Sequence, residues 1–283
     1  MSIADQIYRI KIAKAAIKEA IQNKGVTVSD EAKLSDYATL INSISGSESN
    51  DTWPDYFDRK TKRISDCRYL FSDITIYEVE TKYKELIENF NTSNVYGFDN
   101  VFTLFNSPNA GAGAPDGAIK ELDLTKWNVS NGSSFEQTFS KCNLDYLDIS
   151  GWDFSNNNGT SAYLQLFFGS YIKEVNMTNC NTSKVKTFYR FAYQASELVT
   201  INMTGCDTSA ATNINNMFSS CPKLTTIIGE IDASNITNGL YPGSSTHPFA
   251  KCTSLETVYI KNIYKNIPVT NASKFSVNLS ETK

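Results

Sequence analysis

The sequence has almost none of the residues from which catalytic and metal sites are built. Its 283 residues include a single histidine, His247, and no Cys-x-x-Cys pair, glycine-rich phosphate loop or nucleophile elbow. General acid–base catalysis usually depends on a histidine or on paired carboxylates in a cleft, and zinc sites depend on clustered His and Cys side chains. His247 lies between Thr246 and Pro248, where we expect a loop without a catalytic role. The sequence therefore predicts that the protein is not an enzyme and holds no metal and no cofactor.

Long hydrophobic runs and an excess of basic residues are also missing. No stretch of about 18 apolar residues occurs, so no membrane span is predicted. The 26 Lys and Arg against 30 Asp and Glu give a net charge of −4, which argues against a nucleic-acid-binding surface. Residues 1–24 carry charges throughout and lack the continuous apolar stretch and the cleavage site of a secretory signal. We therefore expect the chain to stay in the cytoplasm or to leave the cell inside a particle, unless a leader has been removed.

The six cysteines do not have the spacing of a disulfide framework or a zinc site. Three of them each follow a phenylalanine by three residues: Cys142, Cys221 and Cys252. Two others, Cys180 and Cys206, stand where Trp127 and Trp152 stand in earlier repeats. Because a free cysteine behaves as a small hydrophobic residue, a position that accepts Trp or Cys is a packing position. The sequence predicts buried, unpaired thiols.

A short pattern recurs along the chain at a nearly constant spacing. It consists of Asn or Asp, any residue, and Ser, and the residue before it is bulky or sulfur-bearing. The pattern begins at six positions: Asn91, Asn128, Asp153, Asn181, Asp207 and Asp232. Successive starts are 37, 25, 28, 26 and 25 residues apart. Such a recurrence is typical of stacked supersecondary units, which form extended binding surfaces more often than catalytic pockets.

Each repeat has three parts. The first is a strand with inward-facing apolar residues: Leu122 and Leu124, Leu147 and Ile149, Val175 and Met177, Ile201 and Met203, then Ile227 and Val258. The second is the Asn/Asp-x-Ser turn, whose short side chains bond nearby backbone N–H groups. The third is a short helical or irregular stretch with a phenylalanine: Phe102, Phe139, Phe168, Phe191, Phe218 and Phe249. These parts predict an α/β solenoid with one short strand and one short helix per repeat.

The chain divides into five segments. Residues 1–45 carry two amphipathic helical stripes and are expected to form an N-terminal helical hairpin, too small to bury both stripes alone. We expect it to dock on another copy or another protein, with packing on the following domain as the alternative; its anchoring residues would be Ile7, Ile10, Ile17, Ile21, Leu34, Tyr37 and Ile41. Residues 46–52 resemble a linker, and residues 53–89 a divergent capping unit with a strand at Ile74, Ile76 and Val79. Repeats fill residues 90–262, and residues 263–283 form a C-terminal cap or tail.

The outward residues of the strands form a candidate binding face. If the inward residues align, one outward column is Glu121, Tyr146, Glu174, Thr200, Thr226 and Thr257, and the next is Asp123, Asp148, Asn176, Asn202, Ile228 and Tyr259. The six residues that we expect to contact a protein or glycan are Tyr146, Asp148, Glu174, Asn176, Asn202 and Tyr259. A solvated sheet face, on which Asn and Thr side chains pair across rungs, is the alternative.

Two strings of the repeats resemble a known family. Asn-Met217-Phe218-x-x-Cys221-x-x-Leu224-x-x-Ile227 and Phe249-x-x-Cys252-x-x-Leu255-x-x-Val258 look like the consensus of BspA-like leucine-rich repeats. The resemblance covers residues 90–262. It implies a solenoid of about six leucine-rich repeats. Such repeats occur in bacterial surface adhesins and in phage-encoded proteins and carry no catalytic residue.

The N-terminal segment resembles a second group. Ala16-Ile17-Lys-Glu-Ala20-Ile21-x-x-Lys24-Gly25-Val26, followed by Leu34-x-x-Tyr37-x-x-x-Ile41, is similar to a helical module at the start of phage tail-fibre and virion-appendage proteins. This resemblance implies a structural virion protein of a bacteriophage, anchored by its helices to other virion proteins, oligomeric, and projecting its repeats toward a host protein or glycan. A bacterial cell-surface adhesin is the alternative function, and an enzyme acting on polysaccharide is the third and weakest candidate. No nucleic-acid or membrane partner is expected.

Overall fold

The computed structural model describes residues 15, 17–23, 27–29, 65–107, 116–157, 164–236, 246–262 and 276–280. The chain divides into two compact units, Met1–Thr52 and Trp53–Lys283. In the first unit, residues 17–22 are helical, as predicted, and Ile21 and Val28 are buried. The second helix of the expected hairpin lies outside the described residues.

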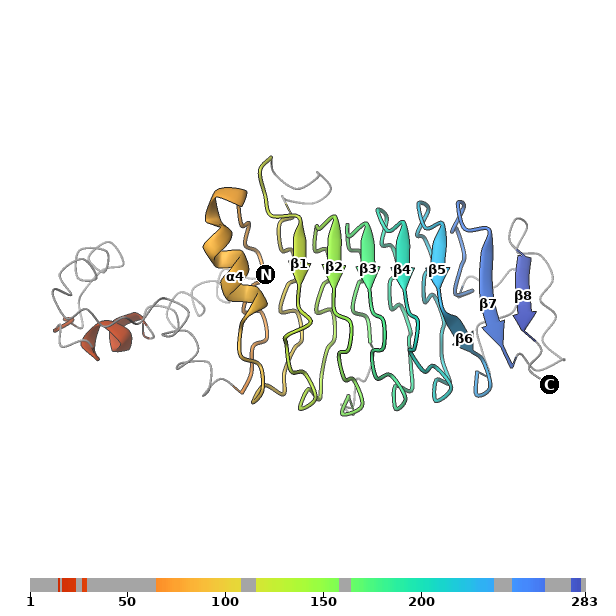
Figure 1. The fold of residues 1–283 in the computed structure, drawn as a ribbon, viewed down its shortest axis with the longest axis horizontal. Coiled ribbons are helices and arrows are strands. Elements are labelled where there is room, and N and C mark those ends of the chain that lie inside the picture. The colour runs from red at the N-terminus through yellow and green to blue at the C-terminus, as the bar shows by residue number, and fades with distance from the viewer. Residues whose placement is uncertain are drawn as a thin grey trace. The chain divides into compact units, whose positions relative to one another are not determined.

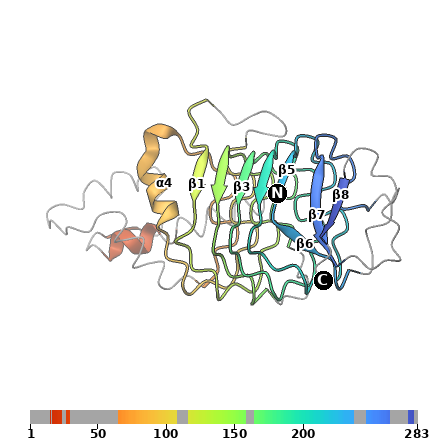
Figure 2. The same ribbon diagram turned by 45° about the vertical axis from the view of Figure 1, so that its right-hand side comes forward.

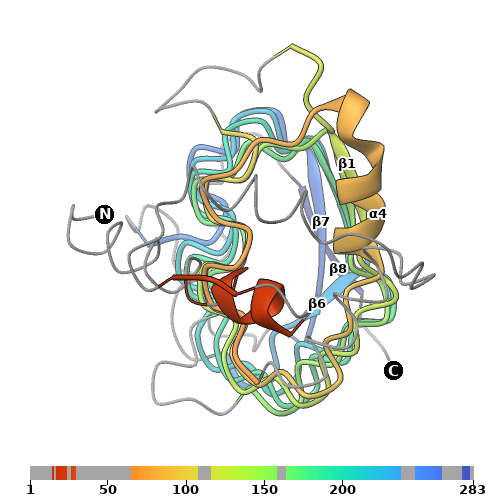
Figure 3. The ribbon, with the colours of Figure 1, turned by 90° about the vertical axis from the view of Figure 1, so that its left-hand side faces the viewer.

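The second unit is a β-solenoid, in which the chain winds through successive coils that superimpose when viewed from one end (Figure 1, Figure 3). Five parallel strands, one per coil, form the first sheet in chain order: β1 (Glu121–Asp123), β2 (Tyr146–Asp148), β3 (Glu174–Asn176), β4 (Thr200–Asn202) and β5 (Thr226–Ile228). A second parallel sheet contains β6 (Glu230–Asp232), β7 (Thr257–Lys261) and β8 (Ser276–Ser280).

The strands lie in register because each points one apolar side chain into the core. Leu122, Leu147, Val175, Ile201 and Ile227 are direct neighbours in the ladder, and all five are buried. The second apolar residue of each predicted pair follows the strand and is also buried, as at Leu124, Ile149, Met177 and Met203. A shift by one residue would expose this row, so burial fixes the register.

The third part of each repeat is not a helix. In the described coils it consists of turns that contain residues with positive φ, often four positions apart, as at Gln137 and Lys141 or Arg190 and Gln194. A left-handed residue cannot continue a right-handed helix. These residues instead bend the chain back toward the next strand, and the predicted helix per repeat is therefore wrong.

An aromatic row runs through the coils. Neighbouring rings lie 5.3 to 6.0 Å apart along the series Phe71, Phe102, Phe139, Phe167, Phe191, Phe218 and Phe249. The sequence pattern predicts Phe168 in this row. Phe167 takes that place with 1 % exposure, and Phe168 is only partly buried and packs on Tyr193. Two adjacent phenylalanines point to opposite sides of the chain, so the sequence could not distinguish them.

The position shared by Trp and Cys is a donor position as well as a packing position. Trp127 Nε1 and Trp152 Nε1 donate to Ile87 O and Leu124 O of the preceding part of the chain at 2.8 and 2.9 Å. In the same place, Cys180 Sγ and Cys206 Sγ contact Ile149 O and Met177 O at 3.1 and 3.2 Å. In these four repeats the residue at this position therefore packs as an apolar group and also donates one hydrogen bond to the preceding coil.

A helix covers the first edge of the sheet. The 3-10 turn η1 (Glu78–Glu80) leads into α4 (Thr81–Glu88), which lies beside β1 (Figure 2). Glu88 Oε1 accepts a hydrogen bond from Asp123 N of β1 at 2.9 Å. The strand predicted at Ile74, Ile76 and Val79 is not formed: one bridge joins Tyr77 to Ala118, and Val79 is 92 % exposed.

Candidate functional site

The outward faces of β1–β5 carry the two predicted polar columns. Glu121, Tyr146, Glu174, Thr200 and Thr226 are successive register partners, and so are Asp123, Asp148, Asn176, Asn202 and Ile228. All ten side chains are exposed or partly exposed. We call this surface the sheet face. It brings five of the six predicted contact residues together: Tyr146, Asp148, Glu174, Asn176 and Asn202.

Hydrogen bonds hold the centre of the sheet face in place. Asp148 Oδ2 accepts from Tyr146 Oη at 3.1 Å and from Asn176 Nδ2 of the next coil at 2.9 Å, while Asp148 Oδ1 accepts from Ser150 N at 2.8 Å. Partial burial raises the pKa of Asp148, but these hydrogen bonds outweigh it and hold the pKa below its usual value. The bond between Asn176 and Asp148 joins neighbouring strands, as we would also expect on a solvated sheet face without a partner. It also fixes the positions of three polar groups on an exposed surface.

The sequence predicts Tyr259 on the sheet face, but the structure does not place it there. The expected register pairs it with Ile228, but Tyr259 pairs with Glu230 of β6. The chain bends at Gly229, which has a φ of 108° between β5 and β6, and the register of β7 moves by two residues. A two-residue shift keeps side chains on the same faces, so Val258 and Ile260 stay buried and Tyr259 stays exposed.

The six Asn/Asp-x-Ser patterns form a ladder of turns along the solenoid. In every one, the Asn or Asp Oδ1 accepts a hydrogen bond from the Ser backbone N, at 2.8 to 3.3 Å. The middle residue joins one coil to the next where it is threonine: Thr92 Oγ1 donates to Asn128 O at 2.9 Å, and Thr182 Oγ1 to Asp207 O at 2.7 Å. The predicted turn chemistry is confirmed: the Asn or Asp bond closes the turn within one coil, and the threonines fasten neighbouring coils.

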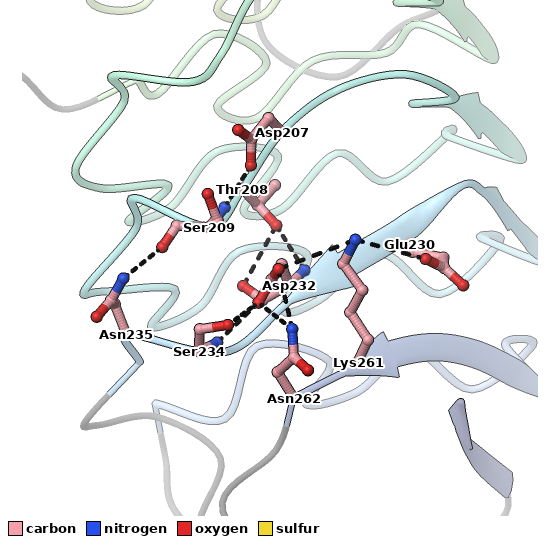
Figure 4. Close-up of polar contacts among 9 residues, drawn as sticks. All are labelled: Asp207, Thr208, Ser209, Glu230, Asp232, Ser234, Asn235, Lys261 and Asn262. Carbon is pink, nitrogen blue, oxygen red and sulfur yellow. Dashed lines mark hydrogen bonds and ion pairs between the residues drawn. The ribbon is translucent and has the colours of Figure 1, made fainter. Parts of the chain in front are cut away.

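Asp232 carries the most extensive of these turns (Figure 4). Its carboxylate accepts from Ser234 N at 2.9 Å and from Asn262 Nδ2 at 3.1 Å, and Lys261 Nζ lies 3.9 Å away. Its backbone N donates to Thr208 Oγ1 of the previous turn at 2.7 Å. Partial burial raises the pKa of Asp232, but the hydrogen bonds and the lysine charge outweigh it and lower the pKa. The described polar groups here bind one another, so the cluster is a structural fastening.

A cationic site that the sequence analysis missed lies in the turns between β3 and β4. The Arg190 guanidinium carbon lies 5.0 Å from the Tyr189 ring centre and 5.2 Å from that of Tyr193. Arg190 Nε and Asn215 Oδ1, in adjacent coils joined by the Arg190 N to Asn215 O bond, are buried without hydrogen-bond partners among the described residues. An arginine between aromatic rings suits a carboxylate or sulfate. The Tyr-Arg-x-x-Tyr spacing was its only sequence signal.

The remaining candidate groups show structural contacts. His247 Nδ1 accepts from Phe249 N at 3.2 Å, and burial lowers the pKa of His247. The six cysteines are free thiols, five buried as predicted and Cys206 partly exposed. Within the described ranges, no three His, Cys, Asp or Glu side chains gather as a metal-ligand set. No helix in those ranges has the length and hydrophobicity needed to cross a membrane.

The predicted anchoring residues fall mostly outside the described ranges. Of the seven, only Ile17 and Ile21 are described; Ile17 is partly buried and Ile21 is buried. Ile7, Ile10, Leu34, Tyr37 and Ile41 lie outside, so the anchoring stripe stays a prediction.

Comparison with known proteins places the solenoid in a family. Residues 57–170 and 163–257 match the family described as "Mycoplasma protein of unknown function, DUF285", and together they span well over half of the chain. No curated protein and no solved structure matches. The family and the solenoid are compatible with the expected BspA-like repeats, whereas the match stops short of residues 1–56 and does not support the phage-type helical module. The chain belongs to the DUF285 family.

Proposed function

We propose that the protein is a non-catalytic recognition protein whose solenoid binds a protein or glycan through the sheet face. The observation that supports this proposal is the register of β1–β5, which places ten outward side chains in two exposed columns. Stacked repeats with such continuous surfaces serve binding more often than catalysis.

The chemistry of the sheet face favours a partner rich in hydroxyl or amide groups. Carboxylates lie at Glu121, Asp123 and Glu174, and amides at Asn176 and Asn202. Carboxylates accept hydrogen bonds, and amides both donate and accept them. Because Tyr146, Asp148 and Asn176 already hold one another, binding would order few additional side chains there, which lowers the entropic cost of association.

The proposed setting is a phage virion, with a bacterial cell surface as the second candidate. The virion setting rests on the resemblance of residues 1–45 to appendage modules, with those residues docking on other virion proteins or on another copy. The cell-surface setting rests on the resemblance of the repeats to the BspA-like repeats that occur in bacterial surface adhesins. Immunogold electron microscopy with an antibody against the solenoid distinguishes them: label on particles supports the first, and label on cell envelopes the second.

Binding can be tested with the full chain on an array of bacterial surface polysaccharides and host-cell glycans, together with pull-down from intact host cells. The double variant Tyr146→Ala/Glu174→Ala removes two neighbouring groups of the sheet face without touching the buried row. We expect it to lose at least about tenfold in affinity, equivalent to about 1.4 kcal/mol, for any partner that the wild type binds.

Two matched variants complete the design. Lys184→Ala removes an exposed charge in a turn outside the sheet face and should bind as the wild type does. Arg190→Gln tests the turns between β3 and β4 instead. If the double variant binds fully and Arg190→Gln loses binding, the contact surface is the Arg190 site and not the sheet face.

A further inference from the structure

Four of the six cysteines form two pairs in adjacent coils. Backbone bonds such as Asn179 N to Thr204 O at 2.7 Å continue the parallel ladder beyond β3 and β4, which places Cys180 level with Cys206. The bond from Ser220 N to Ala250 O at 2.7 Å likewise places Cys221 level with Cys252. Neighbouring parallel segments lie about 4.8 Å apart. Disulfides need Cα separations of about 4.4–6.8 Å, so both pairs have a suitable spacing.

The two pairs also have the same internal geometry. In the first, Cys206 Sγ contacts Met177 O, the carbonyl three residues before Cys180, at 3.2 Å. In the second, Cys252 Sγ contacts Phe218 O, the carbonyl three residues before Cys221, at 2.9 Å. The later thiol of each pair is therefore directed at the coil of its partner. The earlier thiol points one coil further back, so bond formation requires a change of its side-chain rotamer.

The later thiol of each pair is also the more accessible. Cys206 is partly exposed while Cys180 is 1 % exposed, and Cys252 is 6 % exposed while Cys221 is 0 % exposed. A dissolved disulfide reaches the more accessible thiol first, so Cys206 and Cys252 should react first.

We propose that Cys180–Cys206 and Cys221–Cys252 are two oxidation sites that form disulfides between neighbouring coils when a small-molecule disulfide is present. The Cys206 thiolate attacks one sulfur of the small disulfide, forms a mixed disulfide and releases one small thiolate. The Cys180 thiolate then attacks the Cys206 sulfur and releases the second small thiolate. Two protein thiols are oxidised, one small disulfide is reduced to two thiols, and the protons pass to the released thiolates. Cys252 and Cys221 react in the same order.

The other two cysteines serve as internal controls. Cys142 is level with Phe105 in the preceding coil and Ser170 in the next, and Cys67 is level with Phe98. Neither has a cysteine at its level in an adjacent described coil. Both are buried, and burial raises the pKa of Cys67 to about 12, so they should stay reduced.

The test uses the folded full chain with oxidised glutathione, followed by alkylation, proteolysis and mass spectrometry. We expect two cross-linked peptides, 180–206 and 221–252, with Cys67 and Cys142 recovered as alkylated thiols after unfolding. The thermal midpoint should rise by several degrees and return on reduction, because the cross-links restrict the unfolded chain. Six free thiols after prolonged treatment, or cross-links that involve Cys67 or Cys142, would overturn the proposal.

Variants separate the two steps. Cys180→Ala should trap glutathione on Cys206, and Cys221→Ala should trap it on Cys252, since the resolving thiol is gone. Cys206→Ser should abolish the first cross-link and leave the second. If the trapped glutathione is found on neither Cys206 nor Cys252, the order of attack is wrong and the proposal fails.

Discussion

At Asp232, one carboxylate joins two coils. It closes its own turn through Ser234 and accepts from Asn262 in the next coil, beside the Lys261 ammonium. Other turns of the ladder use Asn at this position, as at Asn91 and Asn128, and keep the same bond to serine. The charge at Asp232 therefore adds electrostatic stabilisation to a turn that an amide can also form.

This difference predicts a pH dependence that can be assigned to one residue. The folded-state pKa of Asp232 is lowered, so its contribution is fully present above the unfolded value of about 3.9 and is lost as the pH falls through the folded value. Asp232→Asn should reduce the loss of stability between about pH 5 and pH 2, and Asp232→Ala should also cost about 1–3 kcal/mol at neutral pH. Urea unfolding at several pH values measures both. Parallel pH profiles for wild type and Asp232→Asn would contradict this assignment.

Trp152 combines packing with a buried hydrogen bond. Its side chain is 1 % exposed, stacks on Trp127 at 6.0 Å and donates to Leu124 O. Trp152→Ala should cost about 3–5 kcal/mol through the cavity that it leaves. Trp152→Phe keeps most of the ring and removes the donor, and should cost about 1–3 kcal/mol. Thermal and urea unfolding measure the two values; an unchanged midpoint in Trp152→Ala would contradict the role of this position in the core.

At the scale of elements, the break between β5 and β6 depends on glycine. Gly229 has a φ of 108°, and a Cβ there would lie 2.9 Å from the carbonyl carbon and oxygen of Met203. Gly151 has a φ of 78° but nothing within 4 Å of such a Cβ. Gly151→Ala should therefore cost only the backbone strain, about 1–2 kcal/mol. Gly229→Ala should cost clearly more, about 3 kcal/mol or above, because the backbone of the previous coil must also move.

The comparison of these two glycines tests the position of the sheet break. If both substitutions cost the same in urea unfolding, the close approach of Gly229 to Met203 does not contribute to stability. A larger cost at Gly151 would contradict the described packing of the coils.

The parts of the fold that depend on buried periodic residues could be predicted from the sequence, and the parts that depend on chain bending could not. Leu147 and Ile149 alternate in the sequence and are buried, and the turn at Asn128 forms with the expected bond. The two-residue shift depends on the positive φ of Gly229, which leaves no hydrophobic period, and the adjacent Phe167 and Phe168 fit such a period equally well. The helix predicted in each repeat failed for the same reason.

At the scale of the whole solenoid, each coil contacts mainly its two neighbours. The backbone ladders, the aromatic row and the threonine bonds all connect one coil to the next. Stability of such a protein is approximately a sum of nearest-neighbour terms, and the buried inward residues supply most of the apolar contacts in those terms. The inward period therefore predicts which residues face outward, but it identifies neither a partner nor the Arg190 site.

The chain divides into Met1–Thr52 and Trp53–Lys283, and we expect the first unit to mediate assembly and the second to fold on its own. Removing residues 1–52 leaves the described ladder from residue 65 onward intact, together with α4, which covers the edge of β1. The truncated chain should therefore keep the thermal midpoint of the solenoid to within a few degrees and lose the oligomeric mass of the full chain. Light scattering and circular dichroism of both proteins measure this directly.

A matched full-length variant, Ile7→Asp/Ile10→Asp, should lose the same oligomeric mass without a truncation if the predicted stripe mediates the docking. An unchanged mass in both would mean that residues 1–45 do not assemble the protein, and a large fall in the midpoint would mean that they stabilise the solenoid, which is the alternative that the sequence left open.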